Sequence, residues 1–328
     1  MQRRRFLQLT AGAMAAPILA TCGPRPGSIS PPDRAAGSSP AAEVARFRAE
    51  QRFAKLAHGN IAYVERGSGA AALFLHGFPL NSFQWRGALD RLAPRRRCIA
   101  PDFLALGATE VAEGQSVAPD AQVEMIIALL DQLGVSNVDL VANDSGGAIA
   151  QLIITRHPAR VRTLLLTNCD VEPDSPPPAL APLIQLAHAG TFADTFVPLV
   201  ADKAFARSAK ALGSAFTFPS NPADETIDCY LGPLIGSPRR KQLINAYCLG
   251  LEPNPLAGIE AALRRSTIPT RVLWGTGDII FSQASPDYLG RVLGNSRGVR
   301  RIPDAKLFWP EEYPDLVAEE AQRLWAAG

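Results

Sequence analysis

The chain has 328 residues, of which 47% are hydrophobic and 20% are charged. This globular composition can bury a full core, in two domains or in one large one. The formal net charge of +2 gives no indication of nucleic acid or an acidic membrane as a partner. The five cysteines show no CxxC pair and no zinc-type spacing, so neither a metal nor a cofactor is expected. The sequence leaves open whether Cys229 and Cys248 form a disulfide.

Residues 1–22 have the features of an export signal. Arg3-Arg4-Arg5 precedes a weakly apolar stretch over residues 9–20, which is too short to span a membrane as a helix. The pattern resembles a twin-arginine (Tat) signal peptide, which implies the Tat export machinery as a partner and a location in the periplasm or cell envelope. Residues 19–22 also resemble a lipobox, so membrane attachment is expected only if Cys22 is lipidated. The alternative is a disordered basic N-terminus.

Residues 23–46 are rich in Pro, Gly, Ser and Ala and predict a flexible linker. The folded part is expected to begin near Phe47, with β-segments over residues 52–56 and 60–65. An apolar run over residues 71–75 predicts a strand that is buried on both faces. This run ends in the motif His76-Gly77-Phe78-Pro79.

Helical and strand patterns then alternate along the chain. Helices are predicted over residues 85–92, 120–133 and 146–156, and strands over residues 98–100, 138–142 and 162–167. This alternation predicts a parallel, doubly wound sheet. The pattern is entirely helical over residues 173–265. Strands are predicted again over residues 270–274 and 299–302, and a last helix over residues 315–325.

The turn around Asp144 joins the predicted strand 138–142 to the helix that follows. Its sequence is Val141-Ala142-Asn143-Asp144-Ser145-Gly146-Gly147. Small residues two positions before and after Asp144 let the backbone pass close to itself, so the turn can hold Asp144 in a strained conformation above the sheet. The alternative is an ordinary turn in which Asp144 or Ser145 caps the helix.

This turn, the His76-Gly77-Phe78-Pro79 loop and the later Gly275-Thr276-Gly277-Asp278 turn resemble the motifs of α/β-hydrolases, in particular haloalkane dehalogenases and epoxide hydrolases. The resemblance implies an α/β-hydrolase fold, with a mostly parallel, doubly wound sheet and an inserted helical cap. The core would comprise residues 47–172 and 266–328, and the cap residues 173–265. The expected substrate is a small, mostly apolar molecule.

The resemblance also implies roles for individual residues. Asp144 corresponds to the nucleophile, and Asp278 to the acidic member of the catalytic triad. The backbone N–H groups of Phe78 and Ser145 would form the oxyanion hole. Haloalkane dehalogenases bind the halide with a Trp after the nucleophile and often with an Asn or Trp elsewhere in the pocket, whereas this chain has Ser145 and Phe78. The His76-Gly77-Phe78-Pro79 loop is closer to the epoxide-hydrolase pattern. In that pattern two cap tyrosines protonate the epoxide oxygen, and the candidates are Tyr230 and Tyr247.

The catalytic histidine of the family is absent. Alignment of the segment after the last strand puts Lys306 at the usual glycine and Leu307 at the usual histidine. Of the four histidines, only His188 in the cap is expected to be able to reach the site. Without a histidine, Asp144 can be alkylated, but cleavage of the resulting ester requires another group to activate water.

The candidates to activate water are Lys306, Glu311, Glu312 and a cap residue. Lys306 would have to lose its proton through burial. Glu311 and Glu312 are expected instead to begin the last helix, where carboxylates favour the positive end of the helix dipole.

Two main hypotheses follow. The first is a hydrolase with Asp144 as nucleophile, and the second is a catalytically weak or inactive member that binds a small apolar ligand at the cell envelope. A minor third hypothesis takes Ser145 as the nucleophile, but the small residues of the turn then fall one position out of frame.

Overall fold

The computed structural model describes residues 39–326. The predicted signal peptide with Cys22, and most of the predicted linker, lie outside these residues. Helix α1 covers Pro40–Glu50; Ser39 caps it by accepting a hydrogen bond from the N–H of Ala42, and Pro40 occupies its first turn. Phe47 of this helix is buried. The folded part therefore begins before Phe47, and the predicted linker boundary at residue 46 is wrong.

The core of the fold is a nine-stranded sheet in the order β1-β2-β4-β3-β6-β7-β8-β9, with β5 paired to β2. Strand β2 pairs antiparallel with β1, β4 and β5. The other neighbours in the sheet, from β4 through β3, β6, β7 and β8 to β9, pair parallel. The strands cover Arg52–Leu56, Gly59–Arg66, Ala71–Leu75, Arg97–Pro101, Glu110–Val111, Val138–Asp144, Val161–Cys169, Thr270–Gly275 and Ser296–Ile302. Strands β3 and β6 are buried along their whole length, as expected where helices cover both faces of a parallel sheet.

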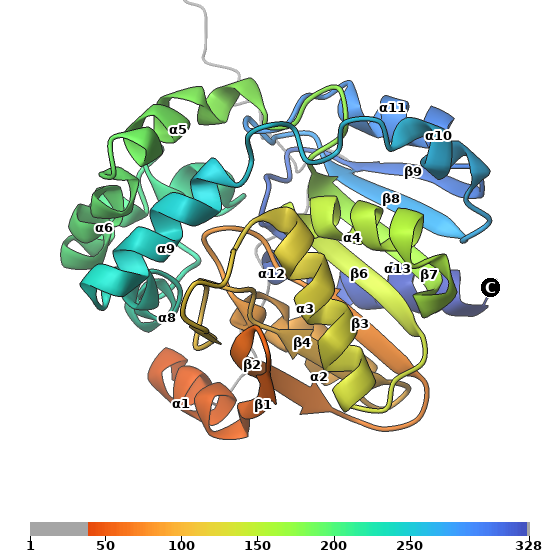
Figure 1. Ribbon diagram of the computed structural model, residues 1–328, viewed down its shortest axis with the longest axis horizontal. Helices are drawn as coiled ribbons and strands as arrows, with labels where there is room; N and C mark the ends of the chain where they lie inside the picture. Colours follow the sequence, from red (N-terminus) through yellow and green to blue (C-terminus); the bar gives the residue numbers. More distant parts are fainter. Residues whose placement is uncertain (1–38, 327–328) are drawn as a thin grey trace, which may run out of the picture.

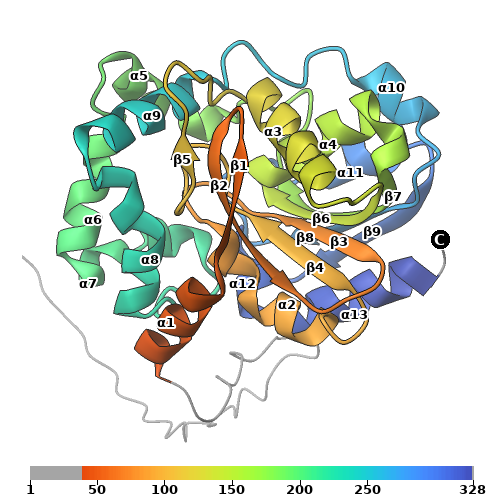
Figure 2. The ribbon, with the colours of Figure 1, turned by 60° about the horizontal axis from the view of Figure 1, so that its bottom comes forward.

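Helices cover both faces of the sheet. Figure 2 shows α3, α4 and α11 on one face, and α2 and α13 on the other. These helices cover Pro119–Gln132, Ser145–Arg156, Ser285–Val292, Arg86–Leu92 and Pro314–Ala326. The short helix α12, Trp309–Glu312, lies just before α13. This layered arrangement confirms the predicted doubly wound fold.

The chain between β7 and β8 forms a group of helices beside the sheet, drawn in green and teal in Figure 1. Its helices are α5 Ala181–His188, α6 Val197–Ala201, α7 Lys203–Ala206, α8 Asp224–Ile235 and α9 Pro238–Leu249, with short 3-10 turns between them. Helix α10, Glu260–Arg265, follows this group in the chain but lies beside α11 and contacts α4 and α11 (Figure 1). Over residues 39–326 no single helix is long and apolar enough to cross a membrane, although the pair Pro178–His188 and Phe192–Ala201, bent by 113°, is long and apolar enough in combination.

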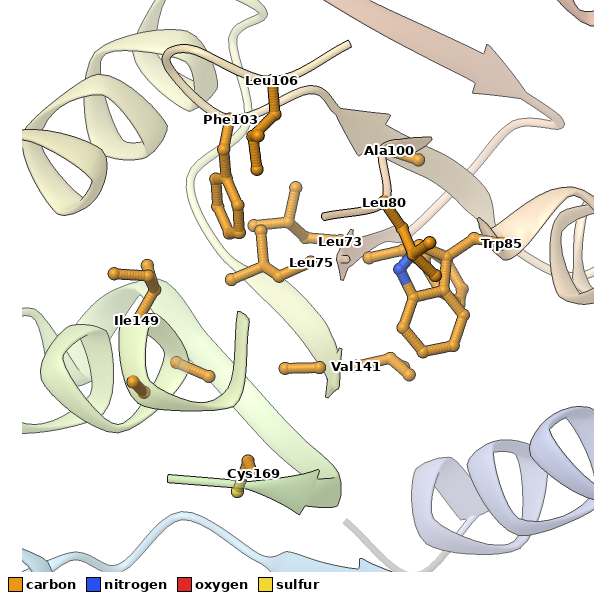
Figure 3. Close-up of a cluster of buried hydrophobic side chains, with 14 of the residues drawn as sticks. Leu73, Leu75, Leu80, Trp85, Ala100, Phe103, Leu106, Val141, Ile149 and Cys169 are labelled. Atoms are coloured by element: carbon orange, nitrogen blue, oxygen red, sulfur yellow. The ribbon is translucent and has the colours of Figure 1, made fainter. Parts of the chain in front are cut away.

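A continuous hydrophobic core lies between the sheet and its helices (Figure 3). Leu73 and Leu75 of β3 and Val141 of β6 are fully or almost fully buried in it, and Trp85 lies beside them. Cys98, Cys169, Cys229 and Cys248 are all buried free thiols, so Cys229 and Cys248 form no disulfide.

Helix α4 approaches the sheet closely at its first turn. A Cβ atom at Gly146 would lie 2.5 Å from the carbonyl oxygen of Leu75 and 2.6 Å from that of His76. One at Gly147 would overlap the side chain of Cys169. Only glycine fits here, because a backbone carbonyl cannot move aside as a flexible side chain can.

This contact gives a first prediction. We expect Gly146→Ala to lower the free energy of unfolding by about 1–3 kcal/mol through steric overlap, as measured by urea denaturation. Gly232→Ala is the matched control, because a Cβ atom at Gly232 in α8 meets nothing within 4 Å. The control should leave stability unchanged or raise it slightly. Equal stability of the two variants would contradict the close approach of α4 to β3.

Candidate active site

Asp144 occupies the sharp turn between β6 and α4. Its backbone angles are φ 54° and ψ −130°, a conformation that costs a residue other than glycine about 1–3 kcal/mol. The first residues of α4 follow immediately, so the Asp144 side chain stands at the carboxyl edge of the sheet, where β3, β6 and β7 end together. The turn is therefore strained, as the small residues around it predict.

The Asp144 carboxylate lies against the loop that follows β3. The backbone N–H of Phe78 donates to its Oδ2 at 2.8 Å, and the backbone N–H of the adjacent Ser145 lowers the pKa of this carboxylate. A Cβ atom at Gly77 would be only 2.6 Å from Oδ2. The two N–H groups predicted for an oxyanion hole thus both face Asp144.

The electrostatic environment disfavours a charge on Asp144. Burial raises the pKa of Asp144 well above its usual value, and the neighbouring carboxylates of Asp170 and Asp278 raise it further. The N–H groups of Phe78 and Ser145 lower its pKa, but by less than burial raises it. Both the desolvation and the like charges act against ionisation.

His76 holds the loop from below. Its Nε2 accepts a hydrogen bond from the backbone N–H of Phe103 at 3.1 Å. The other ring nitrogen, Nδ1, is 2.9 Å from the carbonyl oxygen of Gly77 and must therefore carry the proton. Burial lowers the pKa of His76, which keeps the ring neutral. His76 thus holds the loop in place and does not line the cavity described below.

Two buried amides connect the loop to the Asp144 turn. Gln84 accepts a hydrogen bond from the N–H of Gly77 at 2.9 Å and donates to the side chain of Asn143 at 2.6 Å. Asn143 donates in turn to the carbonyl oxygen of Leu307 at 3.1 Å. The three loops around Asp144 are therefore held in register by one hydrogen-bonded network.

A cavity of about 580 Å³ lies between Asp144 and the helices that follow β7. Its walls are mostly apolar, with Phe78, Phe192 and Phe196 in mutual ring contact and Leu199, Phe281 and Leu307 among the other lining residues. The polar or charged residues that line it are Asp144, Ser145, Asp170, Thr195, Lys210 and Tyr247. A concave, apolar cavity with a few convergent polar groups is the usual form of a small-molecule site.

The two candidate tyrosines have different surroundings. Tyr247 of α9 lines the cavity; its hydroxyl donates to the Ser145 hydroxyl at 3.1 Å, and its ring stacks on Phe78. Burial raises its pKa, so Tyr247 is a neutral hydrogen-bond donor at the site. Tyr230 lies outside the cavity and donates to Glu311 at 2.8 Å. The expectation that Tyr230 contacts a substrate is therefore wrong, because Glu311 already binds its hydroxyl.

Asp278 lies beside the cavity but does not line it. Its carboxylate accepts hydrogen bonds from the side chain of Asn168 and from the backbone N–H of Ile280, both at 2.8 Å. It is buried, and burial raises its pKa. The turn after β8 thus holds Asp278 near Asp144, but no histidine is present for it to orient.

The chain's four histidines all lie within the described residues, and none of them lines the cavity. Leu307 lines it and buries its side chain there. His188, at the end of α5, is exposed and paired with Glu252 at 3.1 Å. His188, the one histidine that the sequence left as a candidate, therefore does not reach the site.

The other candidates to activate water are also outside the cavity. Glu311 is bound by Arg86 and Tyr230, and Glu312 accepts the backbone N–H groups of Thr217 and Phe218. Both glutamates lie in α12 and are buried in these contacts, so the expectation that they begin the last helix is wrong. Lys306 does not line the cavity.

Asp170 is a cavity residue that the sequence reasoning missed. It directly follows Cys169, the last residue of β7, and Cys169 pairs with Asp144 of the neighbouring strand β6. Carboxyl ends of neighbouring parallel strands meet at the same edge of a sheet, so the position of Asp170 directly after a predicted strand was a usable signal. Burial raises its pKa to about 7.

A mostly parallel sheet, an aspartate on the strained turn after β6 and a helical insertion over that turn define an α/β-hydrolase. The model of the alpha/beta hydrolase family matches residues 72–320, and the chain belongs to this family. It is 26% identical over 294 residues to haloalkane dehalogenase 2 of Mycobacterium tuberculosis, covering 82% of this chain and 92% of the relative.

Solved structures show the same fold. An α/β-hydrolase-fold protein from Burkholderia ambifaria superposes with a TM-score of 0.72 at 22% identity, covering 83% of this chain and 97% of the other. The epoxide hydrolase CorEH superposes with a TM-score of 0.69 at 22% identity, covering 84% and 98%. Hydrolase relatives of both the dehalogenase and the epoxide-hydrolase type thus share this architecture.

The raised pKa of Asp170 predicts a pH-dependent change in stability. Its folded pKa of about 7 lies above the unfolded value of about 4, so the folded chain retains a proton that the unfolded chain releases. The free energy of unfolding therefore falls as pH rises from about 4 to about 7. We expect Asp170→Asn to remove this loss and to raise the free energy of unfolding, by up to about 4 kcal/mol at about pH 8.

Urea denaturation at about pH 4 and about pH 8 measures this effect. The control is Asp194→Asn, whose exposed carboxylate pairs with Lys241 at the surface and should change stability by less than about 1 kcal/mol at either pH. A gain for Asp170→Asn that is the same at both pH values would contradict the assigned shift.

Proposed function

We propose that the protein is a hydrolase in which the Asp144 carboxylate attacks a small, mostly apolar electrophile and forms a covalent ester. The observation that carries this proposal is the position of Asp144 at an apolar cavity, with Oδ2 held by the N–H of Phe78 at 2.8 Å. A strained turn and oriented backbone donors favour a nucleophile, because an ordinary capping residue needs neither.

The proposed reaction has two steps. In the first, an Asp144 oxygen bonds to the substrate carbon while the bond from that carbon to its leaving group breaks. In the second, water adds to the Asp144 carboxyl carbon, and the developing oxyanion is stabilised by the N–H groups of Phe78 and Ser145. Release of the alcohol product regenerates Asp144.

An epoxide fits the site better than a haloalkane. Ring opening leaves an alkoxide, which needs a proton or a strong hydrogen-bond donor. The Tyr247 hydroxyl, 3.1 Å from the Ser145 hydroxyl, is such a donor beside Asp144. A departing halide would need N–H donors from side chains. The positions expected to supply these donors in dehalogenases are occupied here by Ser145 and Phe78, whose side chains have no N–H group.

The second candidate function is binding of a small apolar ligand without turnover. Leu307 favours it, because an aliphatic side chain in the position of the family's histidine cannot accept a proton from water. The raised pKa of Asp144 also favours it, since a protonated carboxyl group is a poor nucleophile.

Intact-protein mass spectrometry distinguishes the two functions. After incubation with styrene oxide, and separately with 1-bromohexane and an activated ester, we expect covalent addition or turnover that is absent in Asp144→Asn. The rate should rise with pH, because the raised pKa of Asp144 leaves less of the reactive carboxylate at low pH. Neither an adduct nor turnover with any probe, together with retained binding of the probe in the cavity, would support the ligand-binding function and contradict the hydrolase.

Leu307 offers a gain-of-function test. We expect Leu307→His to speed up turnover of the preferred probe, by up to about 10²–10⁴-fold, the contribution of a general base where no other group already activates water. The reason is that the new imidazole would face the cavity that Asp144 also lines. Leu307→Gln, which adds polarity without a basic group, is the control and should give no comparable gain. A slower Leu307→His variant with unchanged stability would count against a reaction limited by water activation.

A further inference from the structure

Asp170 and Asp144 are two carboxyl groups that line the same cavity. Strands β6 and β7 are parallel neighbours, and Asp144 is paired in register with Cys169. Asp170 is the next residue, and both aspartates line the cavity. The influence of the Asp170 charge on the pKa of Asp144 is a second indication that the two groups are close.

Asp170 is held firmly in this position. The hydroxyl of Ser175 donates to its Oδ1 at 3.1 Å, and the side chain of Gln151 in α4 donates to its backbone carbonyl oxygen at 2.8 Å. Only 4% of the residue is exposed to solvent. A base that must remove a proton from a defined water molecule requires this kind of fixed geometry.

No cation neutralises Asp170 within residues 39–326. Two other buried carboxylates do have such partners: Asp139 is paired with Arg96 and Arg162, and Glu320 with Arg271 and Arg300. Within the same residues, Asp102 and Glu312 are also buried without a cation, but each accepts two backbone N–H groups and neither lines the cavity. An unpaired buried carboxyl group destabilises a fold, so its presence in a cavity points to a chemical role.

We propose that Asp170 is the base that activates water for cleavage of the Asp144 ester, in place of the family's histidine. This inference rests on the proposed function and assigns its second step. The other candidates do not fit this role. Leu307 cannot accept a proton, and Lys306 lies outside the cavity. Glu311 and Glu312 are bound by other groups and His188 is exposed on the surface, whereas Asp170 lines the same cavity as Asp144.

The step balances without a further reactant. The Asp170 carboxylate takes one proton from water as the water oxygen bonds to the carboxyl carbon of Asp144. The N–H groups of Phe78 and Ser145 stabilise the resulting oxyanion. When the ester C–O bond breaks, Asp170 returns its proton to the departing alkoxide. Asp144 retains one oxygen from water, and its own proton is then lost to solvent.

The acid–base properties of Asp170 suit this step. Burial raises its pKa to about 7, and the nearby Asp174 contributes to the rise. A base is most efficient when its pKa is near the working pH. The other titratable groups that face Asp170 are Asp144, which is uncharged once it is an ester, and Cys169 and Tyr247, whose pKa values are raised by burial so that both stay neutral.

The experiment compares ester lifetimes on the full protein. Styrene oxide is added in excess, the reaction is quenched at intervals, and the fraction of chain carrying an adduct on Asp144 is measured by mass spectrometry. We expect Asp170→Asn to form the adduct and to lose it about 10²–10⁴-fold more slowly than the wild type. Asp194→Asn, which alters only a surface ion pair, should behave as the wild type.

The pH profile provides a readout that a structural role would not change. In the wild type, the rate of adduct loss should rise with pH and level off above an apparent pKa near 7, whereas in Asp170→Asn this rise should disappear. Asp170→Glu, which restores a carboxylate, should regain part of the rate. Urea denaturation of each variant verifies that it is folded.

Two results would overturn the inference, and they are distinguishable. If Asp170→Asn forms the adduct and hydrolyses it at the wild-type rate, Asp170 is not the base, although the proposed function stands. If neither the wild type nor Asp170→Asn forms an adduct on Asp144 and neither consumes styrene oxide or the other probes, the proposed function fails and the role of Asp170 fails with it.

Discussion

The strained backbone at Asp144 is the constraint on which the rest of the site depends. A positive φ of 54° turns the chain from β6 into α4 within one residue, and it does so only because α4 packs directly on the end of β3. Gly146 meets two backbone carbonyls there, and Gly77 meets the Asp144 carboxylate itself. A side chain at either glycine would push apart the strand end, the helix start and the loop that bears Phe78. The same close packing that forces the strain also brings the oxyanion donors to Asp144.

The electrostatics of the site follow from this geometry. Because β6, β7 and β8 are parallel and adjacent, the residues at or just after their carboxyl ends gather at one edge, and three of those residues are Asp144, Asp170 and Asp278. Each is buried and has a raised pKa, and within residues 39–326 none takes part in an ion pair. Three buried carboxyl groups in one cluster lower the stability of the fold at neutral pH. Such a loss of stability is typical of functional sites.

The groups proposed to form and to cleave the ester lie at the ends of neighbouring strands. Asp144 at the end of β6 would form the bond to substrate, and Asp170 after β7 would activate the water that breaks it. In this proposal, Leu307 at the position of the family's histidine would change which group accepts the proton but would leave Asp144 as the nucleophile and the N–H groups of Phe78 and Ser145 as the oxyanion donors. Tyr247 from the cap would complete the site by stabilising the leaving oxygen.

The sequence predicted the fold and the local motifs because both depend on short-range patterns. The buried run of β3, the glycines after Asp144 and the helical periodicity after β7 are all local signals. Contacts between distant segments left no such signal. Tyr230 and Tyr247 look alike in sequence, and only the packing of α8 and α9 determines that one binds Glu311 while the other faces the cavity. Asp170 was missed because its partner Asp144 lies on another strand, and Glu311 and Glu312 were misjudged because a turn at Tyr313 separates them from α13.

The most direct test of the account is a single turnover in water enriched in ¹⁸O, with protein in excess over styrene oxide, followed by digestion and mass spectrometry of the peptide that contains Asp144. Attack by Asp144 and cleavage of its ester by water predict that one ¹⁸O atom appears in the Asp144 carboxylate, while the first product carries oxygen from the protein. If the first product is formed with ¹⁸O and the peptide remains unlabelled, water attacks the substrate directly and Asp144 is not the nucleophile.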